Sequence, residues 1–108
     1  MHLVEILLPV GDNEGQPFDA RKYAVVREEL SRRFGGITAF TRAPAEGSSH
    51  AKGTAVHDDI IVFEVMTDTI DRPWWEAYRQ HLEQSFSQDE IVIRAVAITR
   101  LRLNRCSP

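Results

Sequence analysis

The chain has 108 residues, of which 43% are hydrophobic and 27% are charged. This length and composition fit one folded domain and exclude a disordered chain. The 13 basic and 16 acidic residues give a formal net charge of -3, which argues against general polyanion binding, so we expect no nucleic acid partner. The single cysteine, Cys106, can form neither an internal disulfide nor a cysteine metal cage. We therefore expect one cytoplasmic domain over residues 1–108, with no metal and no cofactor.

The first half of the chain predicts a strand, a helix and a second strand. Leu3 to Val10 is a short apolar run that is too short to cross a membrane and has no basic leader of a secretion signal, so no membrane association is expected. Asp19 predicts the N-cap of a helix that ends at Gly35-Gly36, and residues 37–43 predict the second strand. The apolar stripe of this helix is formed by Tyr23, Val26, Leu30 and Phe34.

The second half repeats this order. A flexible loop is expected over about residues 44–56, followed by the most apolar strand, Asp59 to Thr67. Asp71 and Pro73 predict the start of a second helix. Its stripe, Trp75, Tyr78, Leu82 and Phe86, has the same spacing as that of the first helix. A final strand is expected from Ile91 to about Leu103, with a basic tail at about residues 102–108.

Two matched β-α-β halves with short connections predict an α+β fold. The expected architecture is a ferredoxin-like βαββαβ sandwich, a four-stranded antiparallel sheet with two helices on one face. Because side chains alternate along a strand, parity predicts which residues lie under the helices. These are Val4, Ile6, Leu8, Ile61, Phe63, Val65, Ile93, Ala95 and Ala97.

The other face of the sheet is predicted to be open, apolar and charged at a few positions. Its expected members are Leu3, Glu5, Leu7, Thr38, Phe40, Arg42, Ile60, Val62, Glu64, Met66, Val92, Arg94, Val96, Ile98 and Arg100. A face this apolar is seldom left in water, and a second identical sheet would cover it. We therefore expect a homodimer through the open sheet face.

Glu5 and Glu64 are the first candidate for chemistry, because pairing of the first and third strands about their midpoints would place them opposite each other. Two close carboxyl groups in an apolar setting can serve as acid and base. The alternative is cross-strand pairing with Arg94, Arg100 or Arg42, which would fix the register of the sheet or the dimer. No residue is assigned as catalytic at this stage.

Two other features have alternative interpretations. Trp74 lies next to the stripe residue Trp75, about 100° around the helix from it. It either packs on the sheet end or marks a contact or pocket wall. The segment from His50 to Asp59 contains two histidines and two acids, but no metal-binding spacing, and is expected to be a solvated hairpin tip. The ligand or interface candidates are thus Glu5, Phe40, Arg42, Glu64, Arg94 and Trp74.

The chain resembles a family of small uncharacterised bacterial proteins of this architecture. The resemblance lies in Val4-Glu5-Ile6-Leu7-Leu8-Pro9, in Arg33-Phe34-Gly35-Gly36-Ile37-Thr38-Ala39-Phe40 with Arg42 and Pro44-Ala45-Glu46-Gly47, and in residues 86–94. It covers most of the chain and implies no activity. The dimeric α+β barrel superfamily, which includes small monooxygenases and isomerases, is similar in pattern only.

Three functions follow from these observations. The first is a homodimeric small-molecule-binding or interaction domain without catalysis. The second is a small cofactor-free enzyme of the dimeric α+β barrel type, monooxygenase- or isomerase-like, with Glu5, Glu64, Arg42 or Arg94 in a pocket. The third, nucleic acid binding through the arginine-rich tail, is the least favoured because the rest of the chain is acidic.

Overall fold

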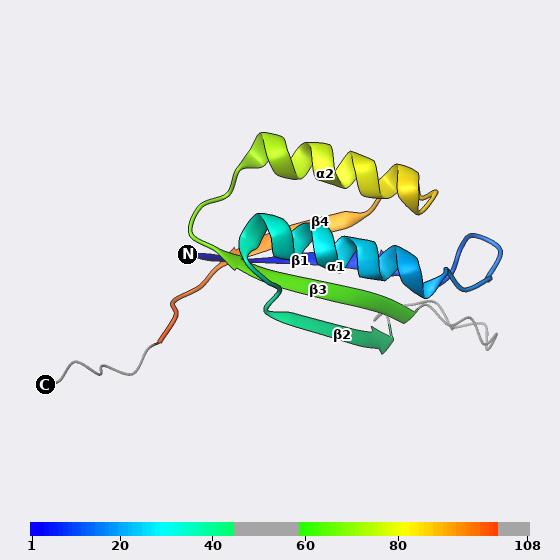
Figure 1. The fold of residues 1–108 in the computed structure, drawn as a ribbon, viewed down its shortest axis with the longest axis horizontal. Coiled ribbons are helices and arrows are strands. Elements are labelled where there is room, and N and C mark those ends of the chain that lie inside the picture. The colour runs from blue at the N-terminus through cyan, green and yellow to red at the C-terminus, as the bar shows by residue number, and fades with distance from the viewer. Residues whose placement is uncertain (45–58, 102–108) are drawn as a thin grey trace, which may run out of the picture.

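The computed structural model describes residues 1–44 and 59–101, and for residues 39–44 and 59 it describes the backbone alone. Its elements are, in chain order, β1 (His2–Pro9), α1 (Ala20–Phe34), β2 (Ala39–Pro44), β3 (Asp59–Thr67), α2 (Arg72–Ser85) and β4 (Val92–Ala97). β3, β1 and β4 form an antiparallel sheet in that order, and the backbone of β2 pairs with the other edge of β3. Both helices lie on one face of this sheet (Figure 1). The predicted α+β class is confirmed.

Both helices begin where their capping residues predict, and α1 also ends at its predicted glycine. The Asp19 carboxylate accepts a hydrogen bond from the Arg21 backbone N–H at 2.9 Å, and Gly35 ends α1 in the left-handed conformation with a φ of 83°. The Asp71 carboxylate accepts from the Trp74 backbone N–H at 3.2 Å, and Pro73 lies in the first turn of α2. Aspartate therefore caps the start of both helices, whereas a glycine ends α1 alone and α2 ends at Ser85 with Phe86 as its C-cap.

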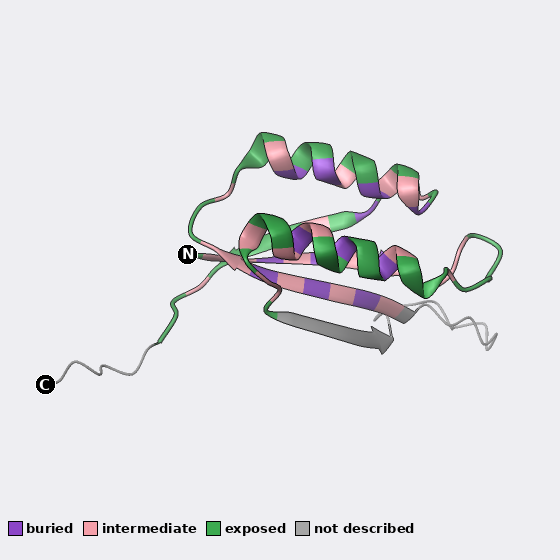
Figure 2. Cartoon of the chain, in the orientation of Figure 1, coloured by how far each residue is buried: buried purple, intermediate pink, exposed green. Residues whose placement is uncertain are grey.

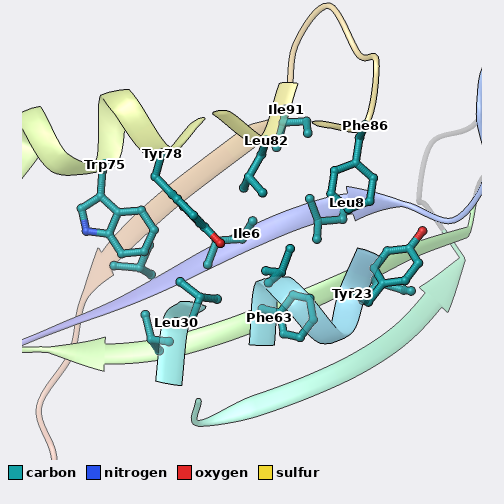
Figure 3. Close-up of a cluster of buried hydrophobic side chains, with 14 residues drawn as sticks. Ile6, Leu8, Tyr23, Leu30, Phe63, Trp75, Tyr78, Leu82, Phe86 and Ile91 are labelled. Atoms are coloured by element: carbon teal, nitrogen blue, oxygen red, sulfur yellow. The ribbon is translucent and has the colours of Figure 1, made fainter. Parts of the chain in front are cut away.

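The core lies between the helices and the sheet (Figures 2 and 3). The predicted stripes of both helices supply it, with Phe34 only half-buried at the end of α1. Its fully enclosed members are Val4, Ile6, Leu8, Leu30, Phe63, Val65, Leu82 and Phe86. All buried residues among those described are hydrophobic, so the core contains no buried charged group. Hydrophobic burial thus holds the helix layer on the sheet, together with the hydrogen bond that the Tyr23 hydroxyl of α1 donates to the Pro9 carbonyl of β1 at 2.5 Å.

Alternation along β1 and β3 follows the predicted parity. Buried and half-buried residues alternate along β1, and Ile6 pairs with Phe63 on the helix side. The expected open-face residues of β1 and β3, among them Leu7 and Val62, are all half-buried. The two faces of the central strands are therefore assigned as the sequence indicates.

β4 is shorter than predicted, because it ends at Ala97 and not near Leu103. Its partner β1 begins at His2, and the last backbone hydrogen bond runs from the Ile98 N–H to the Met1 carbonyl at 3.0 Å. Beyond that point no residue of β1 is left to pair with. Ala95 and Ala97 have the predicted helix-side parity but are exposed, so α2 does not cover the second half of β4.

Candidate functional site

A row of three charged side chains crosses the open face at the middle of the sheet. The register pairs Glu64 of β3 with Glu5 of β1, and Glu5 with Arg94 of β4. Directly paired residues of neighbouring strands point to the same face, so these three side chains are neighbours. The predicted opposition of Glu5 and Glu64 is confirmed by this register. We call Glu64, Glu5 and Arg94 the charged row.

Within the charged row, Arg94 forms an ion pair with Glu5 of its own chain. Its Nε donates to the Glu5 carboxylate at 2.7 Å, and the Glu5 side chain is 20% exposed whereas that of Arg94 is 59% exposed. Of the three arginines predicted as partners for the carboxylates, the structure thus pairs Arg94 with Glu5. Because this contact is partly exposed, it adds little to stability and mainly fixes which side chains face each other.

The pKa values of the two carboxyl groups are shifted in opposite directions. The Arg94 guanidinium, through its hydrogen bond, holds the pKa of Glu5 below its ordinary value. Partial burial and the neighbouring Glu5 raise the pKa of Glu64 above its ordinary value. Glu64 is therefore the member of the row that lacks a cation, and it keeps its proton to a higher pH than Glu5.

Apolar side chains surround the charged row on all the described strands. Leu3, Leu7, Val62 and Met66 lie half-buried along β1 and β3, and Val92 and Val96 are 46% and 48% exposed on β4. The row is thus a set of charges placed within a hydrophobic sheet surface. Such a surface can hold a partner by apolar burial and orient it by charge.

The prediction for β2 is wrong in its parity. The register pairs Phe40 with Phe63 and Arg42 with Ile61, so both positions have the parity of the helix side rather than the open face. Ala39, which pairs with Glu64, is the position that extends the charged row onto β2. The chain leaves α1 through Gly35 and Gly36, which both adopt positive φ, and β2 begins at Ala39, two residues later than predicted. The side chains of Phe40 and Arg42 lie outside the described residues.

Trp74 lies far from the charged row, on the outer side of the helices. Its ring stacks on Tyr78 with centroids 4.9 Å apart and meets Phe34 edge-on at 5.3 Å. The Arg33 guanidinium lies 4.9 Å from its centroid. Trp74 therefore joins the two helices and is partly buried against the core, and its packing on the sheet end stays a prediction. It also lines an open hollow with Arg33 and Tyr78, in keeping with the alternative of a pocket wall.

A bridge between the helices was not predicted. The Tyr78 hydroxyl donates to Glu29 at 2.8 Å, and burial with that neighbouring carboxylate raises the pKa of Tyr78 far above its ordinary value. Arg33 pairs with the capping residue Asp71 at 3.1 Å. The helical spacing of Glu29 and Tyr78 gives no signal for this contact, since it depends on how the helices lie side by side.

The other candidates lie largely outside the description. The side chains of the segment from His50 to Asp59, of the loop at 44–56 and of the tail with Cys106 lie outside the described residues. Over residues 1–38 and 60–101, no group of three or more metal-binding side chains comes together. Neither of the helices in the described part of the chain has the length and apolar character of a membrane span.

The charged row and its apolar surroundings are therefore the site that the sequence and the structure describe together. Comparison of the chain with protein-family models, with curated proteins and with solved structures gives no match.

Proposed function

We propose that this chain is a ferredoxin-like βαββαβ domain that acts as a non-catalytic, homodimeric binding domain, joined through the open face of its sheet. Membership of the small bacterial family that the sequence resembles, and a cytoplasmic location, belong to the same proposal. The observation that carries it is the charged row, two acids and one base in line across a half-buried apolar surface. Because a ferredoxin-like fold hosts many functions, the proposal rests on this surface and not on the fold.

The order of charges in the row makes its two ends, Glu64 and Arg94, complementary to each other. In a face-to-face dimer whose two-fold axis runs along β1, β3 of one protomer lies over β4 of the other. Glu64 would then face Arg94 of the partner subunit, and the contact would occur twice. With the axis across the strands, each charge of the row would face its own copy. The charge pattern therefore favours the first arrangement and disfavours the second.

This arrangement also supplies what Glu64 lacks within one protomer. Glu64 has its pKa raised by burial and by Glu5, and Arg94 of its own chain is committed to Glu5. A second arginine across the interface would favour the ionised form of Glu64 and offset part of the cost of covering it. The apolar residues around the row would supply the affinity.

Sedimentation velocity on the full chain tests the dimer. The expected result is a dimer at micromolar concentration that Leu7→Lys, at the middle of the open face, converts to a folded monomer. Val25→Lys is the matched control, because Val25 is an exposed valine on α1, 49% exposed and away from the sheet. A wild-type chain that remains monomeric at hundreds of micromolar would overturn the proposal, as would a Leu7→Lys variant that is still dimeric.

The second candidate is a cofactor-free enzyme that uses the carboxyl pair. The observation in its favour is that Glu5 and Glu64, side by side, have pKa values pushed in opposite directions, which suits a base and an acid. Glu64→Gln removes the acid while keeping the shape. A variant that remains folded and dimeric and still binds or turns over the same small molecule as the wild type would remove Glu64 from such a role.

A further inference from the structure

A hollow lies on the helix side of the sheet, between α2 and the adjacent ends of β1 and β4. It has a volume of about 540 Å³, within the range of small-molecule sites. The hollow exists because α2 leaves the second half of β4 uncovered, where Ala95 and Ala97 offer little bulk. It is distinct from the open face, which lies on the other side of the same strands.

Two buried polar atoms without a hydrogen-bond partner belong to this hollow. Within the described part of the chain, the buried side-chain nitrogens and oxygens that lack a partner are His2 Nδ1 and Trp75 Nε1. Both residues line the hollow, and Trp75 is only 7% exposed. The indole nitrogen of Trp75 lies on the side of its ring that points away from Tyr78 and the rest of the core (Figure 3). Buried polar groups are nearly always hydrogen-bonded, so two buried polar atoms without a partner in the same hollow indicate that a hydrogen-bonding ligand is missing.

The missing partner is a hydrogen-bond acceptor. An indole N–H can only donate, and a histidine nitrogen can donate as well. Leaving such a donor unpaired destabilises the fold, and an oxygen atom of a ligand would remove that cost. Val4, Ile70 and Ile93 form an apolar part of the wall, and charged side chains line much of the remainder.

The charges at the rim favour an anion. Arg72 is the first residue of α2, so its guanidinium lies at the positive end of the helix dipole. It is exposed, and no ion pair is recorded for it in the described residues. Arg79, by contrast, is held by Glu76 at 2.6 Å and by Glu83 at 2.7 Å, so these two acids are already neutralised in part. Arg94 also lines the hollow and is committed to Glu5.

We infer that this hollow binds a small carboxylic acid with a flat apolar body, of the arylcarboxylate class. The apolar wall takes the ring, Trp75 and His2 donate to a carboxylate oxygen, and Arg72 balances the charge. The inference names the ligand of the binding domain proposed above, but it does not need the dimer, because the hollow and the open face lie on opposite sides of the sheet.

Phenylacetate is the probe, and the indole N–H signals of the two tryptophans report on it in ¹⁵N–¹H spectra. Trp74→Phe assigns the two signals. Saturable movement of the Trp75 signal, with that of Trp74 unmoved, is the expected result. 2-Phenylethanol, which keeps the ring but has no charge, should bind at least tenfold more weakly, and acetate should bind more weakly still.

Two variants test the named contacts. Trp75→Phe keeps an aromatic ring and removes the donor, and it should weaken phenylacetate binding about tenfold, measured by backbone amide signals because this variant lacks the Trp75 indole signal. Arg72→Gln, at an exposed position that does not endanger the fold, should abolish the preference for the acid over the alcohol. Arg32→Gln is the control, because Arg32 lies on α1 and pairs with Glu28. Its binding should equal that of the wild type.

Several results would overturn the inference: no movement of the Trp75 signal at tens of millimolar phenylacetate, equal binding of acid and alcohol, or unchanged preference in Arg72→Gln. The Leu7→Lys variant separates this inference from the dimer. If it is monomeric and still binds phenylacetate, both stand. If the wild type is a dimer but does not bind phenylacetate, the inferred ligand is wrong and the dimer stands. If the wild type binds phenylacetate as a monomer, the dimer is wrong and the inferred ligand stands.

Discussion

The two faces of the central strands are built from similar residues but have different surroundings. On β1, Ile6 and Leu8 are fully buried under the helices, whereas Leu7, which lies between them along the strand, remains half-buried on the open face. Alternation fixes which residues share a face, but it does not determine what covers that face. The open face therefore has residues typical of a core, but no second layer of the protomer covers them in the described structure.

Charge divides the two faces further. All buried residues of the described core are hydrophobic, and the charged row lies on the open side. A hydrophobic core stabilises the fold without specifying a partner, whereas charges in a row favour one orientation of a partner over another. Stability should thus depend mainly on the helix side, and association on the open side.

The largest expected effect is a difference in the free energy of unfolding between substitutions at two adjacent residues of β3. Phe63→Ala removes a fully buried ring at the centre of the core, and should lower the free energy of unfolding by about 3–5 kcal/mol. Val62→Ala, on the opposite face of the same strand, should cost less than about 1 kcal/mol in a monomeric Leu7→Lys background. Urea denaturation followed by circular dichroism measures both. Equal losses would mean that the helix layer is not the source of stability.

The dimer should strengthen as the pH rises. The pKa of Glu64 is raised above its ordinary value of 4.5 in the protomer, and an arginine of the partner subunit would lower it again. The free protomer then binds more protons than the dimer, so association releases protons and is favoured at higher pH. The pairing would occur twice across the interface, so at about 0.7 kcal/mol for each pair the dissociation constant should fall roughly tenfold between pH 4.5 and 7.

Glu64→Gln is the control for this pH dependence, because it keeps the shape of the side chain and removes its titration. Sedimentation at several pH values should show that the slope disappears in this variant. A slope that persists in Glu64→Gln would assign the proton release to other groups.

A smaller effect is expected from Arg94→Met in the monomeric background. The substitution leaves Glu5 opposite Glu64 without a cation, and should lower the free energy of unfolding at pH 7 by about 0.5–1 kcal/mol. Arg94 lowers the pKa of Glu5, so its contribution is present above pH 4.5 and is lost as the pH falls through the depressed pKa. Denaturation curves for wild-type and variant chains should therefore converge in acid; a difference that is constant with pH would mean lost packing rather than lost charge.

The smallest effect has the opposite sign. In a protomer, the raised pKa of Glu64 means that its ionised form destabilises the fold once the pH exceeds that pKa, and this cost is absent below pH 4.5. In the monomeric background, Glu64→Gln should therefore increase the free energy of unfolding by about 0.2–0.5 kcal/mol at pH 7 and leave it unchanged in strong acid. A destabilised variant at pH 7 would contradict the assignment of Glu64 as the uncompensated charge.

The helices and the central strands could be predicted from the sequence, because their signals are local. Asp19, Gly35 and Asp71 cap the helices where expected, and the parity of β1 and β3 places Glu5 opposite Glu64. The order of residues along a strand contains this information, since each side chain's face depends only on its neighbours.

What could not be predicted depends on where elements meet. The parity of Phe40 and Arg42 depends on the exit of the chain from α1, and the end of β4 depends on where β1 begins. The hollow beside Trp75 is invisible in the sequence, because Trp75 fits a core stripe whether or not its indole nitrogen has a partner. Local periodicity has no information on such contacts.

The central claim is that the charged row orients two copies of the chain, and a charge exchange followed by sedimentation tests it most directly. Arg94→Glu alone and Glu64→Arg alone should each weaken the dimer, because like charges would then face each other across the two-fold axis along β1. The double variant, Arg94→Glu with Glu64→Arg, should regain a dissociation constant close to that of the wild type. A double variant that is no better than the weaker single variant would contradict the proposed pairing of Glu64 with Arg94 of the partner subunit.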